Sequence, residues 1–210
     1  MSNHAPVYGN YENKYHARNP ISRFLVNGFL KTFEAFLIHL SKEDIQAVCE
    51  VGCAEGELLR RIHVFYPHSQ LSATDISEEE VEKAGKHCSA FHVNFSIQNA
   101  EDLRSYGDSS FDLVICCEVL EHLDDPARGL SELYRISKKY VLVSVPNEPI
   151  WQGLNLLRGK YVGAFGNTPG HINHWSVFQF PTFLRTAEFA LVKKKYPFPW
   201  QMVLLKKKLP

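Results

Sequence analysis

The chain has 210 residues, of which 45% are hydrophobic and 22% charged, as expected for one folded domain rather than a disordered chain. Its 23 Lys and Arg residues balance its 23 Asp and Glu residues, so it lacks the basic excess that is typical of nucleic-acid-binding domains. No apolar stretch approaches about 18 residues and the first residues do not follow the pattern of a signal peptide, so we expect neither a membrane span nor a leader.

The cysteine content indicates a reducing compartment. The chain has five cysteines, an odd number without a CxxC pair: Cys49, Cys53, Cys88, Cys116 and Cys117. This pattern does not match a disulfide framework or a structural zinc site. We therefore expect a cytoplasmic protein.

The first two thirds of the chain alternate between helical and strand patterns. Apolar residues at spacings of three and four predict a helix over residues 20–40, which packs on the domain or covers its ligand site. The later patterns predict, in chain order, a strand at 45–52, a helix at 55–67, a strand at 71–75, a helix from the Ser77 capping box to about His87, strands at 90–98 and 111–117, a helix at 125–138 and a strand at 140–146. Such alternation indicates a parallel sheet with helices on both faces.

The pattern changes after Pro146. Residues 147–175 are rich in Gly, Asn, Pro and aromatic residues and predict an insertion with one or two helical turns. A helix at about 176–187 and two strands at 189–196 and 200–208 follow, and we expect the two strands to form an antiparallel pair at the sheet edge. The predicted fold class is α/β, a Rossmann-like, mostly parallel seven-stranded sheet in one domain.

The turn between the first predicted strand and the next helix carries the pattern Glu50-x-Gly52-x-Ala54-x-Gly56. Small residues there let the backbone approach a ligand, and the amides at a helix start favour polar or anionic groups. A G-x-G-x-x-G fingerprint aligned on Gly52 would need glycine where Glu57 stands, and no GK[ST] follows. By itself, such a loop is also compatible with a simple tight connection.

An acidic residue, Asp75, ends the second predicted strand, 19 residues after Gly56. In this topology it faces the carboxyl end of the sheet, where a carboxylate can bind ribose hydroxyls. The alternative is a cap for the next helix, a role for which Ser77 is better placed. The loop and the acid together predict a nucleoside-binding site.

Four blocks of sequence point to a family: CEVGCAEG (49–56), ATDIS (73–77), NAEDL (99–103) with FDLVICCEVLEHL (111–123), and YVLVSVPNEP (140–149). In these blocks, and in this order, the chain resembles class I S-adenosylmethionine-dependent methyltransferases of the small-molecule type that includes ubiquinone and menaquinone methyltransferases. The resemblance covers about residues 45–150. It implies an enzyme with S-adenosylmethionine as cofactor, S-adenosylhomocysteine as product and a small-molecule acceptor.

The resemblance also implies roles for single residues. Glu50 would orient the methionine amino group, Asp75 would bind both ribose hydroxyls, and Ile76 would pack on the adenine. Asn99, where relatives commonly have Asp, would accept from the adenine amino group, and Ala54 replaces a more usual glycine. The complete expected cofactor set is Glu50, Gly52, Cys53, Ala54, Gly56, Asp75, Ile76, Asn99, Ala100, Glu101 and Cys117.

Three histidines are candidate catalytic bases. His122 follows the strand at 111–117, and His171 and His174 lie in GHINHWS before the last helix. Alignment of the reactants alone can lower the barrier by about 7–11 kcal/mol, and a base adds about 10²–10⁴ in rate, so a base is optional. His122 has the alternative of supporting its own loop. The HxxH spacing is compatible with a metal pair, but because we find no third ligand we predict no metal site.

Two groups of aromatic residues allow two interpretations each. Those of the insertion form either an acceptor pocket or a small core: Trp151, Tyr161, Phe165 and Trp175. Those near the N-terminus form either a lid over the cofactor or a tail: Tyr8, Tyr11 and Tyr15.

Charged residues also gather in two places. Lys193–Lys195 and Lys206–Lys208 favour protection of a sheet edge over a platform for an anionic ligand. The acidic residues expected around the ligand site are Glu50, Asp75, Glu118 and Glu121. An acidic site suits a cationic sulfonium.

We expect a single domain, residues 1–210, whose segments have different roles. The parts are an N-terminal lid and helix (1–40), a cofactor-binding core (45–146), an acceptor-site insertion (147–175) and the last helix with two edge strands (176–210). An RNA or protein methyltransferase is disfavoured because no [DN]PP[YF] motif follows the strand at 111–117 and no recognition domain is visible. A non-catalytic cofactor-binding subunit, the acceptor atom and the oligomeric state stay open.

Overall fold

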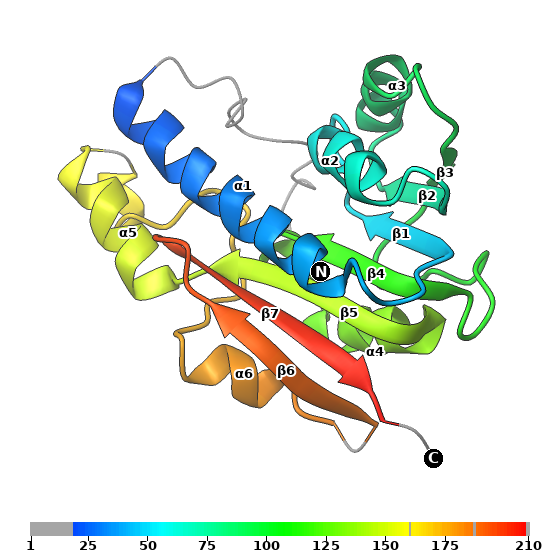
Figure 1. Ribbon diagram of the computed structural model, residues 1–210. Helices are drawn as coiled ribbons and strands as arrows, with labels where there is room; N and C mark the ends of the chain where they lie inside the picture. Colours follow the sequence, from blue (N-terminus) through cyan, green and yellow to red (C-terminus); the bar gives the residue numbers. More distant parts are fainter. Residues whose placement is uncertain (1–18, 160, 187, 209–210) are drawn as a thin grey trace.

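The computed structural model describes residues 19–159, 161–186 and 188–208, which form a seven-stranded sheet flanked by helices (Figure 1). The strands are β1 (Ala47–Val51), β2 (Gln70–Asp75), β3 (Asn94–Ile97), β4 (Phe111–Cys117), β5 (Ser137–Pro146), β6 (Phe189–Lys195) and β7 (Trp200–Lys207). The α-helices are α1 (Pro20–Leu40), α2 (Glu57–Phe65), α3 (Glu78–His87), α4 (Pro126–Ile136), α5 (Glu148–Leu157) and α6 (Gln179–Phe183), with short 3₁₀ turns η2 (Leu120–His122) and η3 (Val162–Ala164).

The strand order is β3-β2-β1-β4-β5-β7-β6. The first five strands in this order are parallel, and β7 pairs antiparallel with both β5 and β6. This arrangement confirms the predicted α/β, Rossmann-like fold and its antiparallel edge pair. Because parallel strands share a direction, the carboxyl ends of β1, β2, β4 and β5 meet at one edge of the sheet. The last residues of these strands are Val51, Asp75, Cys117 and Pro146.

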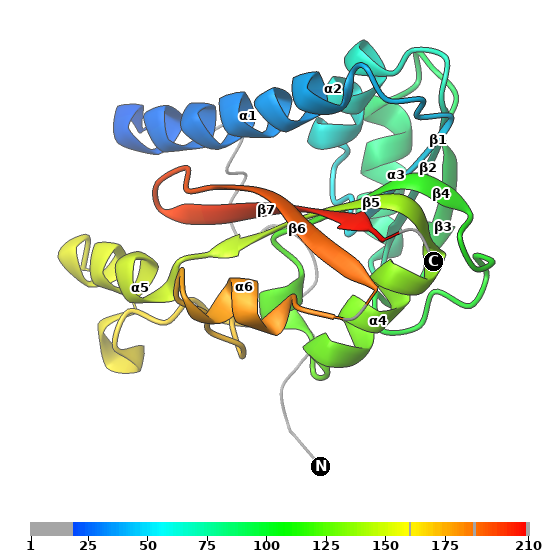
Figure 2. The ribbon, with the colours of Figure 1, turned by 60° about the horizontal axis from the view of Figure 1, so that its bottom comes forward.

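Helices cover both faces of the sheet, as Figure 2 shows. The helices α1, α2 and α3 pack on one face, and α4 and α6 pack on the other. Each face has its own cluster of buried apolar residues. No helix in the described ranges is long and apolar enough to cross a membrane.

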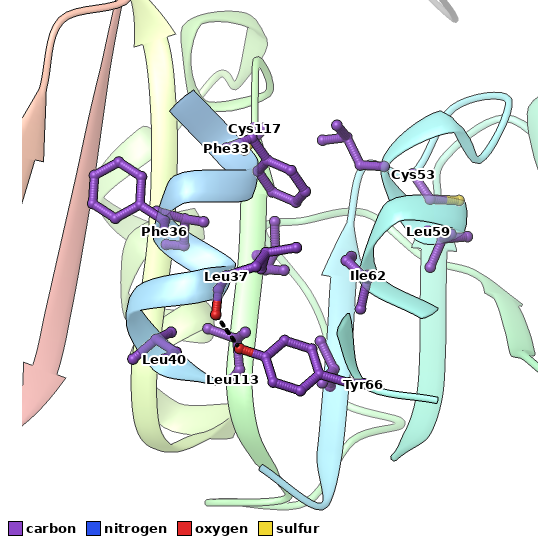
Figure 3. Packing of buried hydrophobic residues seen from close by; sticks show 14 of the residues in the cluster. Phe33, Phe36, Leu37, Leu40, Cys53, Leu59, Ile62, Tyr66, Leu113 and Cys117 are labelled. Carbon is purple, nitrogen blue, oxygen red and sulfur yellow. Dashed lines mark hydrogen bonds between the residues drawn. The ribbon is translucent and has the colours of Figure 1, made fainter. Parts of the chain in front are cut away.

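The helix α1 is part of the core. Its buried side chains, Phe33, Phe36, Leu37 and Leu40, pack near α2 and the sheet (Figure 3). The Tyr66 hydroxyl donates a hydrogen bond of 3.0 Å to the carbonyl of Leu37. Since each fully buried Leu or Phe contributes about 1.5–3 kcal/mol, the docking of this helix stabilises the whole domain.

Most elements differ from their predicted bounds by one to three residues at an end; for example, β5 begins at Ser137 rather than at 140, so α4 ends at Ile136 rather than at 138. Three elements differ in other ways. The pairing of β3 with β2 covers only residues 94–97 rather than 90–98. The last helix covers 179–183 rather than 176–187. At its start, Ser176 and Gln179 exchange side-chain to backbone hydrogen bonds as a capping box before the regular helix begins. The insertion contains a ten-residue helix, α5, where we expected one or two turns.

Candidate cofactor and acceptor site

The loop after β1 has the left-handed backbone that its small residues predict. Its φ angles are 77° at Gly52, 43° at Ala54 and 84° at Gly56. A Cβ added at Gly52 would overlap Cγ2 of Val119, which follows β4. Position 52 therefore requires glycine, both for its positive φ angle and because a Cβ would collide with Val119. Ala54 also has a positive φ angle, which glycine adopts more easily.

Two loop residues also serve the packing of the fold. A Cβ at Gly56 would lie 3.1 Å from the sulfur of Cys88 and 3.2 Å from Cβ of Ala84, so glycine lets α2 approach α3. The Cys53 side chain is buried in the core, and this burial raises the pKa of its thiol far above the usual range. Only the backbone of Cys53 is suited to a ligand.

The Asp75 carboxylate connects the end of β2 to the glycine loop. Its Oδ2 accepts a hydrogen bond of 2.9 Å from the backbone N–H of Ala54, and its Oδ1 accepts one of 3.0 Å from Ser77. Ser77 caps α3 with its own side chain. Burial raises the pKa of Asp75, although the backbone hydrogen bonds oppose this shift. A buried carboxylate at this position is equipped to accept hydrogen bonds from a diol.

The residues expected near adenine lie around Asp75. Ile76 is 46% exposed although it is apolar, as a residue that stacks on a ligand ring needs to be. The backbone N–H of Gln98 donates to the Asp75 carbonyl, and Asn99 Oδ1 accepts from the backbone N–H of Glu101 at 2.9 Å. One acceptor position of Asn99 is thus already used by its own turn.

The same segment contains two further residues of the predicted cofactor set. Ala100 is buried, and Glu101 accepts a hydrogen bond of 2.9 Å from the backbone N–H of Asp125. The Glu101 carboxylate therefore also supports the start of α4.

The residues expected near the methionine portion lie on β1 and β4. Glu50 and Cys117 are both buried near the ends of these neighbouring strands. Glu118 follows with a φ of 62° and exchanges hydrogen bonds with Ser144, backbone to backbone at 3.0 Å and side chain to side chain at 2.9 Å. A non-glycine residue in this strained conformation is typical of functional sites.

The turn η2 connects the histidines to the glycine loop. His122 lies one turn after Val119 and donates its backbone N–H to the Val119 carbonyl. Its Nδ1 lies 2.9 Å from the carbonyl oxygen of Gly170, and its ring centroid is 4.9 Å from that of His171. Two candidate bases that are distant in sequence are therefore side by side at this edge of the sheet.

A residue that the sequence analysis missed, Glu148, joins the other two histidines. Its Oε1 lies 2.6 Å from Nδ1 of His171 and 3.6 Å from Nδ1 of His174. Glu148 and His171 are 2% and 7% exposed, whereas the His174 side chain is 38% exposed. The available signal was an acid two residues after the strand at 140–146, close to the carboxyl end of a strand as Asp75 is at the end of β2.

One group of side chains has the spacing of metal ligands. Within the described residues, candidate ligand atoms of Glu121, His122 and His171 all lie within 4.8 Å of one another. Carboxylate and imidazole ligands suit first-row divalent ions. The HxxH pair is not this group, since His174 does not belong to it and the third member comes from η2.

The aromatic residues of the insertion separate in the structure. Trp151 lies beside His171, with ring centroids 6.4 Å apart, and donates a hydrogen bond of 2.8 Å to the hydroxyl of Thr168. Trp175 instead packs on Phe180 and Phe183 of α6.

The remaining aromatic residues do not join these two groups. Phe165 is exposed, and Tyr161 is partly buried beside η3. The tyrosines considered for a lid lie outside the described residues: Tyr8, Tyr11 and Tyr15.

The fold defines a Rossmann-like α/β protein, and the loop and the acid expected to bind a nucleoside lie at the carboxyl ends of its strands. Residues 49–143 match the family model described as "Methyltransferase domain". This match and the curated relatives described next identify the chain as a member of the class I S-adenosylmethionine-dependent methyltransferases, a family whose cofactor is S-adenosylmethionine.

Curated relatives include the "Ubiquinone biosynthesis O-methyltransferase" of Xanthomonas campestris pv. campestris (strain B100), 30% identical over 156 residues that cover 69% of this chain and 62% of the relative. The protein of the same name from Xanthomonas axonopodis pv. citri (strain 306) is 28% identical over 183 residues, covering 83% of this chain and 67% of the relative. The chain thus spans less than two thirds of the length of the first relative.

Solved structures of the same fold include the magnesium protoporphyrin IX methyltransferase from Synechocystis PCC 6803 with bound S-adenosylhomocysteine, with a TM-score of 0.72 at 18% identity, covering 93% of this chain and 91% of that chain. The plantazolicin methyltransferase BpumL, also with S-adenosylhomocysteine, has a TM-score of 0.69 at 17% identity, covering 94% and 89%. These similarities confirm the fold.

Proposed function

We propose that this protein transfers the methyl group of S-adenosylmethionine to an oxygen atom of a small-molecule acceptor, and that His171 takes up the acceptor proton. The observation that carries this proposal is the buried His171, 2.6 Å from the Glu148 carboxylate, at the sheet edge where Asp75 holds the glycine loop. The O-methyltransferase name of the curated relatives supports oxygen as the acceptor atom.

The site residues fit the proposed cofactor. The left-handed loop at Gly52 permits close approach of the methionine portion, Asp75 supplies acceptors for the ribose hydroxyls, and the exposed Ile76 supplies an apolar surface for adenine. Four acidic residues also lie near or beyond the carboxyl ends of β1, β4 and β5: Glu50, Glu118, Glu121 and Glu148. Negative groups at this edge favour a cationic ligand over its neutral product.

When bound, S-adenosylmethionine supplies an electrophilic methyl group, and the electrons of the broken C–S bond stay on the sulfur of S-adenosylhomocysteine. The acceptor hydroxyl gives its proton to His171 as its oxygen forms the bond to carbon. The Glu148 carboxylate then faces a positively charged imidazolium. Such a base contributes about 10²–10⁴ to the rate, in addition to alignment of the reactants.

The proposed roles of the segments follow from this assignment. Residues 45–146 would bind the cofactor. The insertion at 147–175 carries Glu148, Trp151 and His171 and would contact the acceptor. Residues 176–210 would complete the sheet with its last two strands. The balanced charge of the chain supports a small acceptor over a nucleic acid.

Transfer of a labelled methyl group tests the proposal. Purified protein is incubated with S-adenosyl-[methyl-¹⁴C]methionine and catechol or 3,4-dihydroxybenzoate as hydroxyl acceptors, with tryptamine as an amine control and with total RNA and casein as macromolecular controls. We expect label in a phenol and a fall of about 10²-fold in kcat for His171→Gln. Label only in tryptamine, RNA or casein would contradict the proposed acceptor class. Binding of S-adenosylhomocysteine without transfer to any of them would favour a non-catalytic subunit.

A further inference from the structure

The side chain of Glu148 is almost completely buried, which is unusual for an acidic residue. Glu148 is the first residue of α5, two residues after the end of β5, and is 2% exposed. Burial of an ionised carboxylate is costly unless hydrogen-bonded or charged partners compensate it. The start of a helix provides part of this compensation. Two imidazoles lie close to its Oε1, and its Oε2 has no hydrogen-bond partner among the residues that the structure describes.

The bond between Glu148 and His171 determines the form of the imidazole. Because a carboxylate accepts hydrogen bonds, the distance of 2.6 Å between Glu148 Oε1 and His171 Nδ1 fits the tautomer in which Nδ1 carries the proton and donates it. In the neutral ring, the lone pair is then on Nε2. We infer that Glu148 is the positioning residue of the site: it holds His171 in the tautomer whose Nε2 accepts the proton of the acceptor. This inference rests on the proposed function.

Two neighbouring rings pack around the imidazole of His171. Trp151 lies nearly parallel to it and the ring of His122 lies at 75° to it, so both limit rotation. The backbone of His171 is held as well, with its N–H on the Thr168 carbonyl and its own carbonyl on the Asn167 side chain. A preorganised ring of this kind loses little entropy when the reaction occurs.

The other two histidines have different contacts. Nδ1 of His174 is 3.6 Å from Glu148 Oε1, beyond hydrogen-bond distance, and its side chain is 38% exposed. Nδ1 of His122 lies 2.9 Å from the carbonyl oxygen of Gly170, and candidate ligand atoms of His122 and Glu121 lie within 4.8 Å of each other. The hydrogen bond of 2.6 Å to Glu148 therefore favours His171 as the residue prepared for proton transfer.

Nuclear magnetic resonance of the ¹⁵N-histidine-labelled protein tests the tautomer without any acceptor. In the wild type, we expect protonated Nδ1 and unprotonated Nε2 for His171. In Glu148→Gln, the amide can donate to Nδ1, so we expect a shift to the Nε2–H form. A wild-type His171 that carries its proton on Nε2 would overturn the inference, whatever the acceptor turns out to be.

Kinetics test whether the tautomer matters, with the acceptor found by the labelled-methyl assay. We expect Glu148→Gln to lower kcat about 10²-fold or more, with less than about threefold change in the acceptor KM and in the Kd of S-adenosylhomocysteine, and Glu148→Asp to recover part of the loss. Because Glu148 acts through His171, the double variant Glu148→Gln/His171→Gln should be no slower than His171→Gln alone. Additive losses would contradict the inference.

Two controls separate other roles. Asp112→Asn replaces a buried carboxylate near the start of β4, at the opposite end of this strand from Cys117, where it accepts hydrogen bonds from the backbone N–H groups of Gln46 and Ala47, and should leave kcat unchanged. Chelation with EDTA should also leave kcat unchanged. Loss of activity on chelation, with recovery on adding a divalent ion, would assign His171 to a metal site and overturn its role as base. Methyl transfer with wild-type rates in Glu148→Gln would refute the inference but leave the proposed function intact.

Discussion

The Asp75 carboxylate holds the backbone N–H of Ala54 at 2.9 Å, across 21 residues of sequence. The acid proposed to bind ribose and the loop proposed to bind methionine are therefore one hydrogen-bonded unit. A change at either residue should affect both the cofactor affinity and the conformation of the loop.

Asp75→Asn should weaken binding of S-adenosylhomocysteine about 10- to 100-fold, because a hydrogen bond to a charged group contributes about 1.5–3 kcal/mol. Isothermal titration calorimetry measures this change. Asp108→Asn, which removes an exposed carboxylate paired with Arg135, is the matched control and should bind like the wild type. Equal affinities for the wild type and Asp75→Asn would remove Asp75 from the cofactor site.

The pH dependence of cofactor binding should follow the raised pKa of Asp75. Two ribose hydroxyls need the ionised carboxylate as acceptor, so affinity should fall as the pH drops through this pKa, above the ordinary Asp value of about 3.9. Calorimetry over a pH series measures the fall, which Asp75→Asn should lack. An identical pH profile in that variant would assign the effect to another group.

The same pKa has the opposite consequence for the free protein. A raised pKa means that the folded state binds a proton in a pH range where the unfolded state has lost it. Asp75 should therefore make the free energy of unfolding decrease as the pH rises through that range. Urea unfolding of the wild type and of Asp75→Asn, compared over this range, checks the sign.

Gly52→Ala should destabilise the domain by more than the roughly 1–2 kcal/mol that a left-handed residue costs, because its Cβ also meets Val119. The second change Val119→Ala should restore part of the loss. Gly28→Ala is the control, since a Cβ there meets nothing within 4 Å in the middle of α1 and should be neutral or stabilising by up to about 1 kcal/mol. Urea denaturation measures all four proteins. A Gly52→Ala variant as stable as the wild type would show that the loop adapts.

Leu37→Ala should destabilise the fold by about 2–5 kcal/mol, because Leu37 is fully buried between α1 and the sheet. The adjacent Ile38→Ala should change stability by less than about 0.5 kcal/mol, since Ile38 is 58% exposed. Thermal unfolding of both variants distinguishes a core helix from a movable cover. Similar small effects in the two variants would mean that α1 contributes little to the fold.

Local patterns in the sequence were sufficient for most elements of the fold. Apolar spacing predicted α1 with its observed ends, β-branched and aromatic content predicted β4 at residues 111–117, and the Ser77 capping box predicted the start of α3. The position of Asp75 at the end of a parallel strand also followed from the order of strands and helices. These features depend on residues a few positions apart, so one sequence contains their signal.

Only the tertiary structure paired Glu148 with His171 and placed both beside His122. These residues come from α5, a loop of the insertion and η2, and the three segments meet because the insertion folds back over the ends of the strands. No local spacing encodes that contact, since it depends on the path of the intervening backbone. The order of the elements and the local sequence patterns thus indicated the family and the end of the sheet at which the cofactor is expected. Long-range packing decided that the buried carboxylate of Glu148 binds the imidazole of His171.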